Sequence, residues 1–266
     1  MTPISPLEIV KRTPKSNCGE CGYPTCLAFG AAVAKTGGDP RHCPYIKLDG
    51  LTFDKDNPPA KNQREKDLEF VAHLKSKITP LDFNCIAKKY GATLANNNPD
   101  TLLFNYLGQQ VQLSKETILI NGQEPKDPRD QILLYNYISS PEDIPLANDW
   151  LGLESLPNSI SKVKTLATYC EDRLAKLFSS QSADKINSIL AQLQSFPPPE
   201  NTASIAAIIP VLPMVPQYLL FWEEEPEDSF EAKVKILFDL NVLYYLDIES
   251  LIFSSERMAD KILELC

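Results

Sequence analysis

The stretch CGECGYPTCLAFGAAVAKTGGDPRHCP, residues 18–44, decides the fold of the first part of this chain. It holds four of the seven cysteines, with two, four and sixteen residues between successive ones: Cys18, Cys21, Cys26 and Cys43. Four thiolates on so short a segment can close around one metal centre, and an iron–sulfur cluster ordinarily takes four cysteine ligands. We call these four residues the cysteine motif, and their spacing predicts a metal site.

Two glycines and two prolines lie beside the cysteine motif. Reduced clusters carry negative charge on their sulfurs, so backbone N–H groups have to point at them, and glycine lets the backbone approach closely. Gly19 and Gly22 suit this role, and Pro24 and Pro44 rigidify the turns. We expect these four residues to line the cofactor-binding site.

A zinc site with four cysteine ligands would hold a small module folded equally well. Zinc sites more often pair two short C-x2-C knuckles. This segment has one such knuckle, and its fourth cysteine follows a predicted helix over residues 26–36. The spacing favours iron–sulfur over zinc and leaves zinc as the alternative. A disulfide framework is disfavoured, because the chain has seven cysteines, an odd number, and four of them lie within the first 43 residues.

The other three cysteines are scattered along the chain. Cys85 and Cys170 lie in helix-like segments with apolar neighbours, where a free cysteine usually behaves as a small buried hydrophobe. Cys266 is the last residue. We expect no metal ligand among these three.

Composition describes a globular chain of 266 residues, and its hydrophobic content of 43% is enough for a core. The 26 Lys and Arg residues against 35 Asp and Glu give a net charge of −9, which repels polyanions and speaks against a nucleic-acid partner. No segment approaches the about 18 consecutive apolar residues that a membrane-spanning helix needs, and the N-terminal residues show no signal-peptide pattern. We expect a cytoplasmic protein with no direct membrane span.

Residues 49–61 are polar and turn-forming, with Gly50, Pro58 and Pro59, and are predicted to be a linker. This places a domain boundary near residue 55, between a cluster-binding module (1–55) and a second domain (56–266). The predicted fold class is α+β: a small helical iron–sulfur module followed by a mixed domain of antiparallel strands and helices.

The second domain shows both helical and strand periodicity. Helices are predicted over residues 63–78, 80–90, 127–138, 159–178, 183–193 and 248–265. Strands are predicted over 101–106, 109–113 and 116–120 as a meander, and over 204–209, 217–222 and 233–239. The proline-punctuated run PVLPMVP (210–216) is expected to separate two of these strands. A cleft between this run and the aromatic residues near Phe221 and Phe238 is the first place to look for a ligand.

No nucleotide-binding glycine fingerprint, P-loop, nucleophile elbow or HExxH motif is present. The sequence therefore offers no catalytic residue. Whether the chain is an enzyme stays open, and a non-enzymatic electron carrier is favoured because such a carrier needs no acid–base residues.

Residues 10–50, with the cysteine motif, the run GYPT (22–25) and Pro44, resemble a known domain. It is the small four-iron, four-sulfur domain at the N-terminus of the large subunit of the corrinoid iron–sulfur protein of anaerobic acetyl-CoA metabolism. The same domain type occurs in the B subunit of Rnf electron-transport complexes. The resemblance implies a low-potential [4Fe-4S] cluster bound by Cys18, Cys21, Cys26 and Cys43.

The remainder resembles an uncharacterised domain family that is often fused behind this cluster module in anaerobic bacteria and archaea. The segments that carry the resemblance are DPRDQILLYNYI (127–138), PMVPQYLLFWEEE (213–225) and ILFDLNVLYYLDIESL (236–251). That family has no established activity.

The functional expectation is low-potential electron transfer in anaerobic metabolism. The expected partner is a redox protein, either a corrinoid protein or a membrane electron-transport complex. Two alternatives stay open: an accessory enzyme or cofactor-binding protein of corrinoid and methyl-transfer metabolism, or a protein in which the cluster is structural or sensory.

Overall fold

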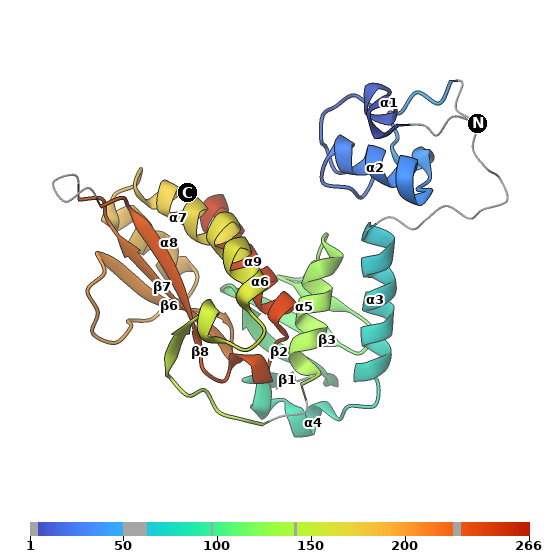
Figure 1. Cartoon of the computed structure of the whole chain (residues 1–266). Helices are drawn as coiled ribbons and strands as arrows, with labels where there is room; N and C mark the ends of the chain where they lie inside the picture. Colours follow the sequence, from blue (N-terminus) through green and yellow to red (C-terminus); the bar gives the residue numbers. More distant parts are fainter. Residues whose placement is uncertain (1–4, 50–62, 97, 141–142, 226–229) are drawn as a thin grey trace. The chain divides into compact units, whose positions relative to one another are not determined.

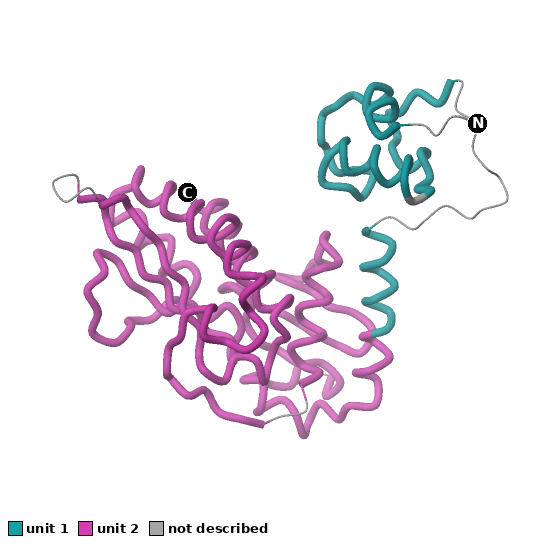
Figure 2. The backbone as a smooth tube through the Cα atoms, viewed as in Figure 1, with its two compact units in different colours: residues 1–73 teal, residues 74–266 magenta. Residues whose placement is uncertain are grey.

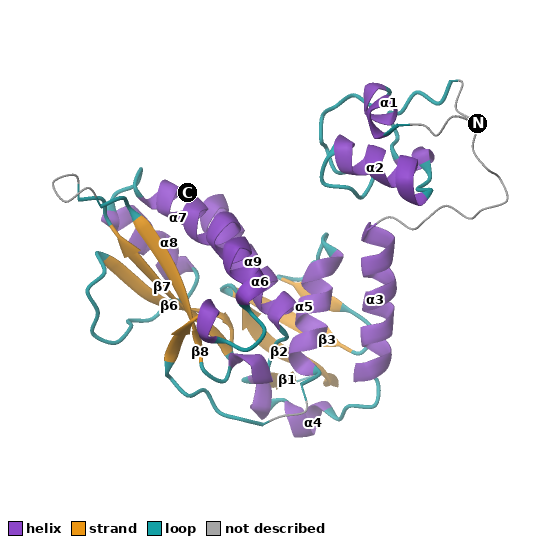
Figure 3. Cartoon of the chain, viewed as in Figure 1, coloured by secondary structure: helices purple, strands orange, loops and turns teal. Residues whose placement is uncertain are grey.

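The computed structural model describes residues 5–49, 63–96, 98–140, 143–225 and 230–266 (Figure 1). The chain divides into two compact units, Met1–His73 and Leu74–Cys266 (Figure 2). Most of the predicted linker lies outside the described residues. The α+β class is confirmed, with a small helical module first and a unit of helices and antiparallel sheets after it (Figure 3).

Residues 5–49 of the first unit form two helices and a short 3-10 turn: α1 (Pro6–Lys11), α2 (Cys26–Thr36) and η1 (Pro40–His42). Helix α2 has the bounds expected from the sequence. Its N-cap Thr25 accepts a hydrogen bond from the backbone N–H of Ala28, and Gly37 ends it in the left-handed conformation at φ 72°.

Helices α1 and α2 pack backbone against backbone. A Cβ atom on Gly30 would lie 2.6 Å from the carbonyl oxygen of Pro6, so the absence of a side chain allows this contact. Ile9 and Phe29 form a small core with two of the four cysteines, Cys21 and Cys43. The cysteine motif is therefore part of the core of its unit.

Helix α3 (Gln63–Ile78) begins in the first unit and ends in the second. A short helix and a 3-10 turn follow it, α4 (Phe83–Ile86) and η2 (Lys88–Tyr90). A single helix was expected over residues 80–90, and the structure breaks it into these two pieces.

The described residues of the second unit form two four-stranded antiparallel sheets. The first is a meander in chain order: β1 (Thr93–Ala95), β2 (Asn98–Tyr106), β3 (Gln109–Ser114) and β4 (Ile118–Ile120). The second has the order β5-β8-β7-β6: β5 (Trp150–Gly152), β8 (Lys233–Asp239), β7 (Val215–Trp222) and β6 (Ile205–Leu212). The two sheets meet directly where the backbone N–H of Leu107 donates to the carbonyl of Val211 at 3.0 Å.

Helices pack on the sheets: α5 (Pro128–Ile138), α6 (Ile160–Leu166), α7 (Asp172–Phe178), α8 (Ala183–Gln192) and α9 (Ile248–Leu265). A π-helical turn, η4 (Ala167–Glu171), joins α6 to α7, and η3 (Leu153–Ser155) and η6 (Val242–Tyr244) are 3-10 turns. Helix α9 contacts the second sheet through Gln217, whose side-chain amide donates to the Ser254 hydroxyl at 2.8 Å. Among the described helices, none combines the length and apolar character that crossing a bilayer requires.

The proline-punctuated run contains the turn between two strands, as expected, but only its central residues Pro213 and Met214 lie outside them. Strands β6 and β7 extend through Pro210 and Pro216, which lie opposite each other near the end of the hairpin. Proline lacks the N–H that a ladder needs, but β8 pairs with β7 only from Gln217 onward, so no bond to β8 is lost. Of the three strands that are only three residues long, β4 was predicted and β1 and β5 were not.

Candidate metal centre

The four cysteines of the motif come from two loops and one helix end. Cys18 and Cys21 lie between α1 and α2, Cys26 is the first residue of α2, and Cys43 directly follows η1. Three of them are buried, with exposed fractions of 8% (Cys21), 9% (Cys26) and 6% (Cys43), whereas Cys18 is exposed. None forms a disulfide.

The turn that carries Cys18 and Cys21 has glycine at two positions that require it. Gly19 and Gly22 have φ values of 75° and 79°, in the left-handed region, and the N–H of Gly22 donates to the carbonyl of Gly19 at 2.8 Å. Pro24 and Pro44 are both exposed beside the motif. The glycines give the loop its shape, and contact of these four residues with a cofactor stays a prediction.

Two other motif cysteines act on the Cys21 thiol. Burial raises the pKa of the Cys21 thiol, and the charges of Cys43 and Cys18 raise it further, so these three groups lie within electrostatic reach. A cation would offset this repulsion and favour the thiolates.

The fourth thiol has a different setting. The Asn17 side-chain oxygen accepts a hydrogen bond from the backbone N–H of Cys26 at 2.8 Å, which ties the preceding loop to the start of α2. A hydrogen bond from the Thr13 hydroxyl lowers the pKa of the Cys26 thiol, and a backbone bond from Asn17 adds to the effect. The start of a helix also favours a thiolate. The Cys26 thiol therefore loses its proton more readily than an ordinary cysteine does.

The donor set suits an iron–sulfur cluster because all four groups are free thiols on one segment. In the part of the chain that the structure describes, no three His, Cys, Asp or Glu side chains gather closely enough to hold a single metal ion. The assignment of Cys18, Cys21, Cys26 and Cys43 as ligands stays a prediction.

Sequence reasoning missed a pair of residues beside the motif. The Tyr45 hydroxyl lies 3.1 Å from Oε1 and 3.0 Å from Oε2 of Glu20 and donates to this carboxylate. The bond to Glu20, with smaller effects that include the charges of Cys18 and Cys43, raises the pKa of Tyr45, so its hydroxyl keeps its proton and remains a donor. Their positions within three residues of motif cysteines were the only signal in the sequence.

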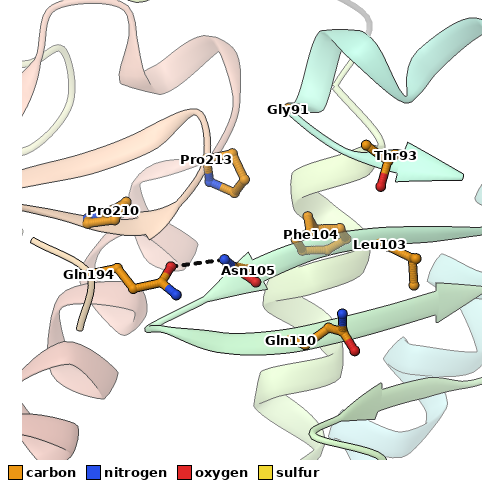
Figure 4. A pocket seen from close by; sticks show the side chains of 9 residues that line it. All are labelled: Gly91, Thr93, Leu103, Phe104, Asn105, Gln110, Gln194, Pro210 and Pro213. Carbon is orange, nitrogen blue, oxygen red and sulfur yellow. Dashed lines mark hydrogen bonds between the residues drawn. The ribbon is translucent and has the colours of Figure 1, made fainter. Parts of the chain in front are cut away.

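A pocket of about 420 Å³ lies between the two sheets of the second unit (Figure 4). Pro210 and Pro213 form one wall, as expected for the proline-punctuated run, but the opposite wall is the first sheet rather than the aromatics near Phe221. Figure 4 shows Asn105 and Gln194 meeting across the pocket, where the Asn105 amide donates to the Gln194 oxygen at 2.9 Å. The lining carries no charged side chain among the described residues.

Two family models match the chain. Residues 82–261 match the family described as "Domain of unknown function (DUF3786)", which covers more than half of the chain. Residues 14–45 match the model described as "Putative Fe-S cluster".

Curated relatives match the N-terminal part alone. The corrinoid/iron-sulfur protein large subunit of Moorella thermoacetica is 52% identical over 44 residues, which are 16% of this chain and 10% of that protein. Subunit gamma 2 of the acetyl-CoA decarbonylase/synthase complex of Methanosarcina mazei is 50% identical over 42 residues, 16% of this chain and 9% of that subunit. The gamma subunit of Archaeoglobus fulgidus is 38% identical over 68 residues, 26% of this chain and 14% of that subunit.

The matched segment thus spans about a tenth of the length of these relatives. Comparison with solved structures finds no significant match. The chain belongs to the family described as a domain of unknown function, DUF3786, and carries an iron–sulfur cluster domain ahead of it.

Proposed function

We propose that the cysteine motif binds one [4Fe-4S] cluster through Cys18, Cys21, Cys26 and Cys43, and that the protein transfers single electrons at low potential. When bound, the cluster supplies reversible one-electron chemistry. The chain's own residues hold and shield it, and the second unit docks on the protein that receives the electron.

One observation carries this proposal. Four free cysteines lie within one short segment, and three of them are buried in the core of their unit although no disulfide joins them. Unpaired thiols of this kind serve a small module best as metal ligands, because thiolates bind iron–sulfur clusters and stabilise the fold when loaded.

The partner is proposed from the relatives. The matched proteins are named as a corrinoid/iron-sulfur protein and as subunits of acetyl-CoA decarbonylase/synthase complexes. This supports a redox partner linked to corrinoid metabolism, in a cytoplasmic setting. A membrane electron-transport complex is the other partner class, and the net charge of −9 favours a basic docking face on either.

The test is an anaerobic redox titration of the full chain followed by EPR. A cluster that accepts one electron reversibly from a low-potential reductant supports the electron carrier. A bound cluster that no such reductant reduces would contradict electron transfer and favour a structural or sensory cluster.

A second candidate function is binding of an organic cofactor by the second unit. The pocket between the sheets favours it, because its volume of about 420 Å³ lies within the usual range of ligand pockets. A chromophore or small molecule retained through anaerobic purification, and lost in a Gln194→Gly variant, would establish this function. Gly tolerates the left-handed φ of 59° at residue 194, so the variant keeps the backbone.

A further inference from the structure

The cysteine motif has one exposed side. Cys21, Cys26 and Cys43 are each less than one tenth exposed, whereas Cys18 lies on the surface. Solvent and chelators therefore reach a bound cluster first beside Cys18. The residues around Cys18 therefore determine how easily a chelator can remove iron from the site.

One hydrogen-bonded pair joins the segments that meet there. Glu20 lies between Cys18 and Cys21 in the chain, and Tyr45 follows Cys43 by two residues. The Tyr45 hydroxyl donates to the Glu20 carboxylate, with both carboxylate oxygens within 3.1 Å. This bond connects the two stretches of chain that carry three of the four cysteines.

The backbone around Tyr45 is anchored on its C-terminal side. The next two residues donate their N–H groups to the carbonyl of Cys43, at 3.3 Å, and to the carbonyl of Arg12, at 3.1 Å. Glu20 is an exposed residue on a glycine-containing turn. The tyrosine therefore restrains the glutamate, and through it the turn that carries Cys18 and Cys21.

We infer that Tyr45 is a positioning residue of the cluster site: its hydrogen bond to Glu20 holds the Cys18–Cys21 turn closed and slows the loss of iron. The inference rests on the proposed function, because it requires a cluster at the cysteine motif. Tyr45 donates no ligand in this role. It acts on the mobility of a turn that supplies two ligands.

The test measures how fast a chelator removes iron from the anaerobically loaded full chain, followed by the decay of its visible absorbance. Tyr45→Phe keeps the ring and removes only the hydroxyl. We expect its initial iron and sulfide contents to equal those of the wild type and its iron to be lost about fivefold faster, as the loss of one surface hydrogen bond to a charged group gives. Tyr169→Phe is the matched control, because the two tyrosines are similarly exposed, 55% at Tyr169 and 53% at Tyr45.

Variants of Glu20 distinguish an effect of the Tyr45–Glu20 hydrogen bond from a general loss of stability. Glu20→Gln keeps an acceptor oxygen but removes the charge that strengthens the bond, so it should lose iron at a rate between those of the wild type and Tyr45→Phe. Glu20→Ala should behave as Tyr45→Phe does. The double variant Tyr45→Phe/Glu20→Ala should lose iron no faster than either single variant, because each single change already removes the same hydrogen bond.

Equal rates for wild type and Tyr45→Phe would overturn the inference, and so would effects that multiply in the double variant. A wild-type chain that holds no iron and sulfide would overturn the proposed function instead, before any variant is compared.

Discussion

Arg257 on α9 binds Asp130 on α5 through two parallel hydrogen bonds, Nε to Oδ1 at 2.9 Å and Nη2 to Oδ2 at 3.1 Å. The Tyr106 hydroxyl donates to the same carboxylate at 3.1 Å. The Asp130 side chain is 4% exposed. This three-residue network connects the first sheet, α5 and α9, so it ties the layers of the second unit together.

Arg257→Met should therefore lower the free energy of unfolding of the second unit by about 3 kcal/mol, because it leaves the Asp130 charge buried without its cation. Both tryptophans, Trp150 and Trp222, lie in this unit, so their fluorescence during denaturant unfolding reports on it alone. Arg173→Met is the control. The Arg173 guanidinium pairs with Asp260 at 2.9 Å on the surface, and we expect its replacement to lower the free energy of unfolding by less than about 1 kcal/mol. Equal losses in the two variants would contradict the account of the network.

A second prediction concerns pH. Burial raises the pKa of Glu171, whose Oε1 accepts the backbone N–H of Ile236 at 3.0 Å; this bond and Lys235 oppose the rise, while Glu154 and Asp172 add to it. A raised pKa means that the folded state holds the proton more tightly than the unfolded state. Its stabilising contribution is complete below the ordinary glutamate pKa and is lost as pH rises through the raised value.

Glu171→Gln keeps an acceptor for the Ile236 N–H and removes this titration. The free energy of unfolding should then decline less steeply as pH rises above the ordinary glutamate pKa. Denaturant unfolding followed by tryptophan fluorescence, across about pH 4 to 7, measures this slope. Glu154→Gln provides a comparison of opposite sign. A bond from its own backbone N–H and then Lys235 lower the pKa of Glu154, so its contribution is lost as pH falls. An unchanged slope in Glu171→Gln would show that the burial of this carboxylate has no such effect.

The junction of the two sheets offers a third prediction. Gly91 has φ 60°, and a Cβ there would lie 2.6 Å from the Cβ of Pro213. Gly91→Ala should destabilise the second unit by roughly 2–4 kcal/mol, from left-handed strain and overpacking together. Gly122→Ala measures the left-handed strain alone, because Gly122 has φ 77° and no atom lies within 4 Å of the added Cβ. This variant should lower the free energy of unfolding by about 1–2 kcal/mol. An equal loss of stability in Gly91→Ala and Gly122→Ala would mean that Pro213 moves aside at no energetic cost.

The cysteines outside the motif should differ in reactivity. Cys170 is fully buried and burial raises its pKa, whereas Cys85 and Cys266 are exposed. Alkylation of the native chain, followed by mass spectrometry, should label Cys266 and Cys85 and leave Cys170 unmodified until unfolding. Cys85 should react more slowly than Cys266, because its hydrogen bond to Asp82 raises its pKa. Labelling of Cys170 at the rate of the other two would contradict its burial.

The long periodic segments could be predicted from the sequence, since α5, α8, α9, β2 and β3 each carry an amphipathic or alternating pattern. Helix α2 could be predicted from its small helix-forming residues and from Gly37, which ends it. The three-residue strands β1 and β5 carry no such pattern. They form because Leu94 pairs with Leu102 and Leu151 pairs with Phe238 across the sheets. Helix α4 is too short to bury every apolar position, which is why the expected burial of Cys85 was wrong while that of Cys170 was confirmed.

The candidate site could be located because its cysteines are local in sequence. The bond of Tyr45 to Glu20, the effect of Thr13 on Cys26 and the first-sheet wall of the pocket depend on contacts between distant residues. Spacing contains no information about such contacts.

The central claim is that four particular cysteines hold one iron–sulfur cluster. Iron and acid-labile sulfide per chain, measured after anaerobic purification of the wild type and of seven single Cys→Ser variants, test it most directly. We predict about four irons and four sulfides in the wild type and lower contents when Cys18, Cys21, Cys26 or Cys43 is replaced, with no change for Cys85, Cys170 or Cys266. Equal iron in all seven variants, or one zinc and no sulfide in the wild type, would contradict the claim.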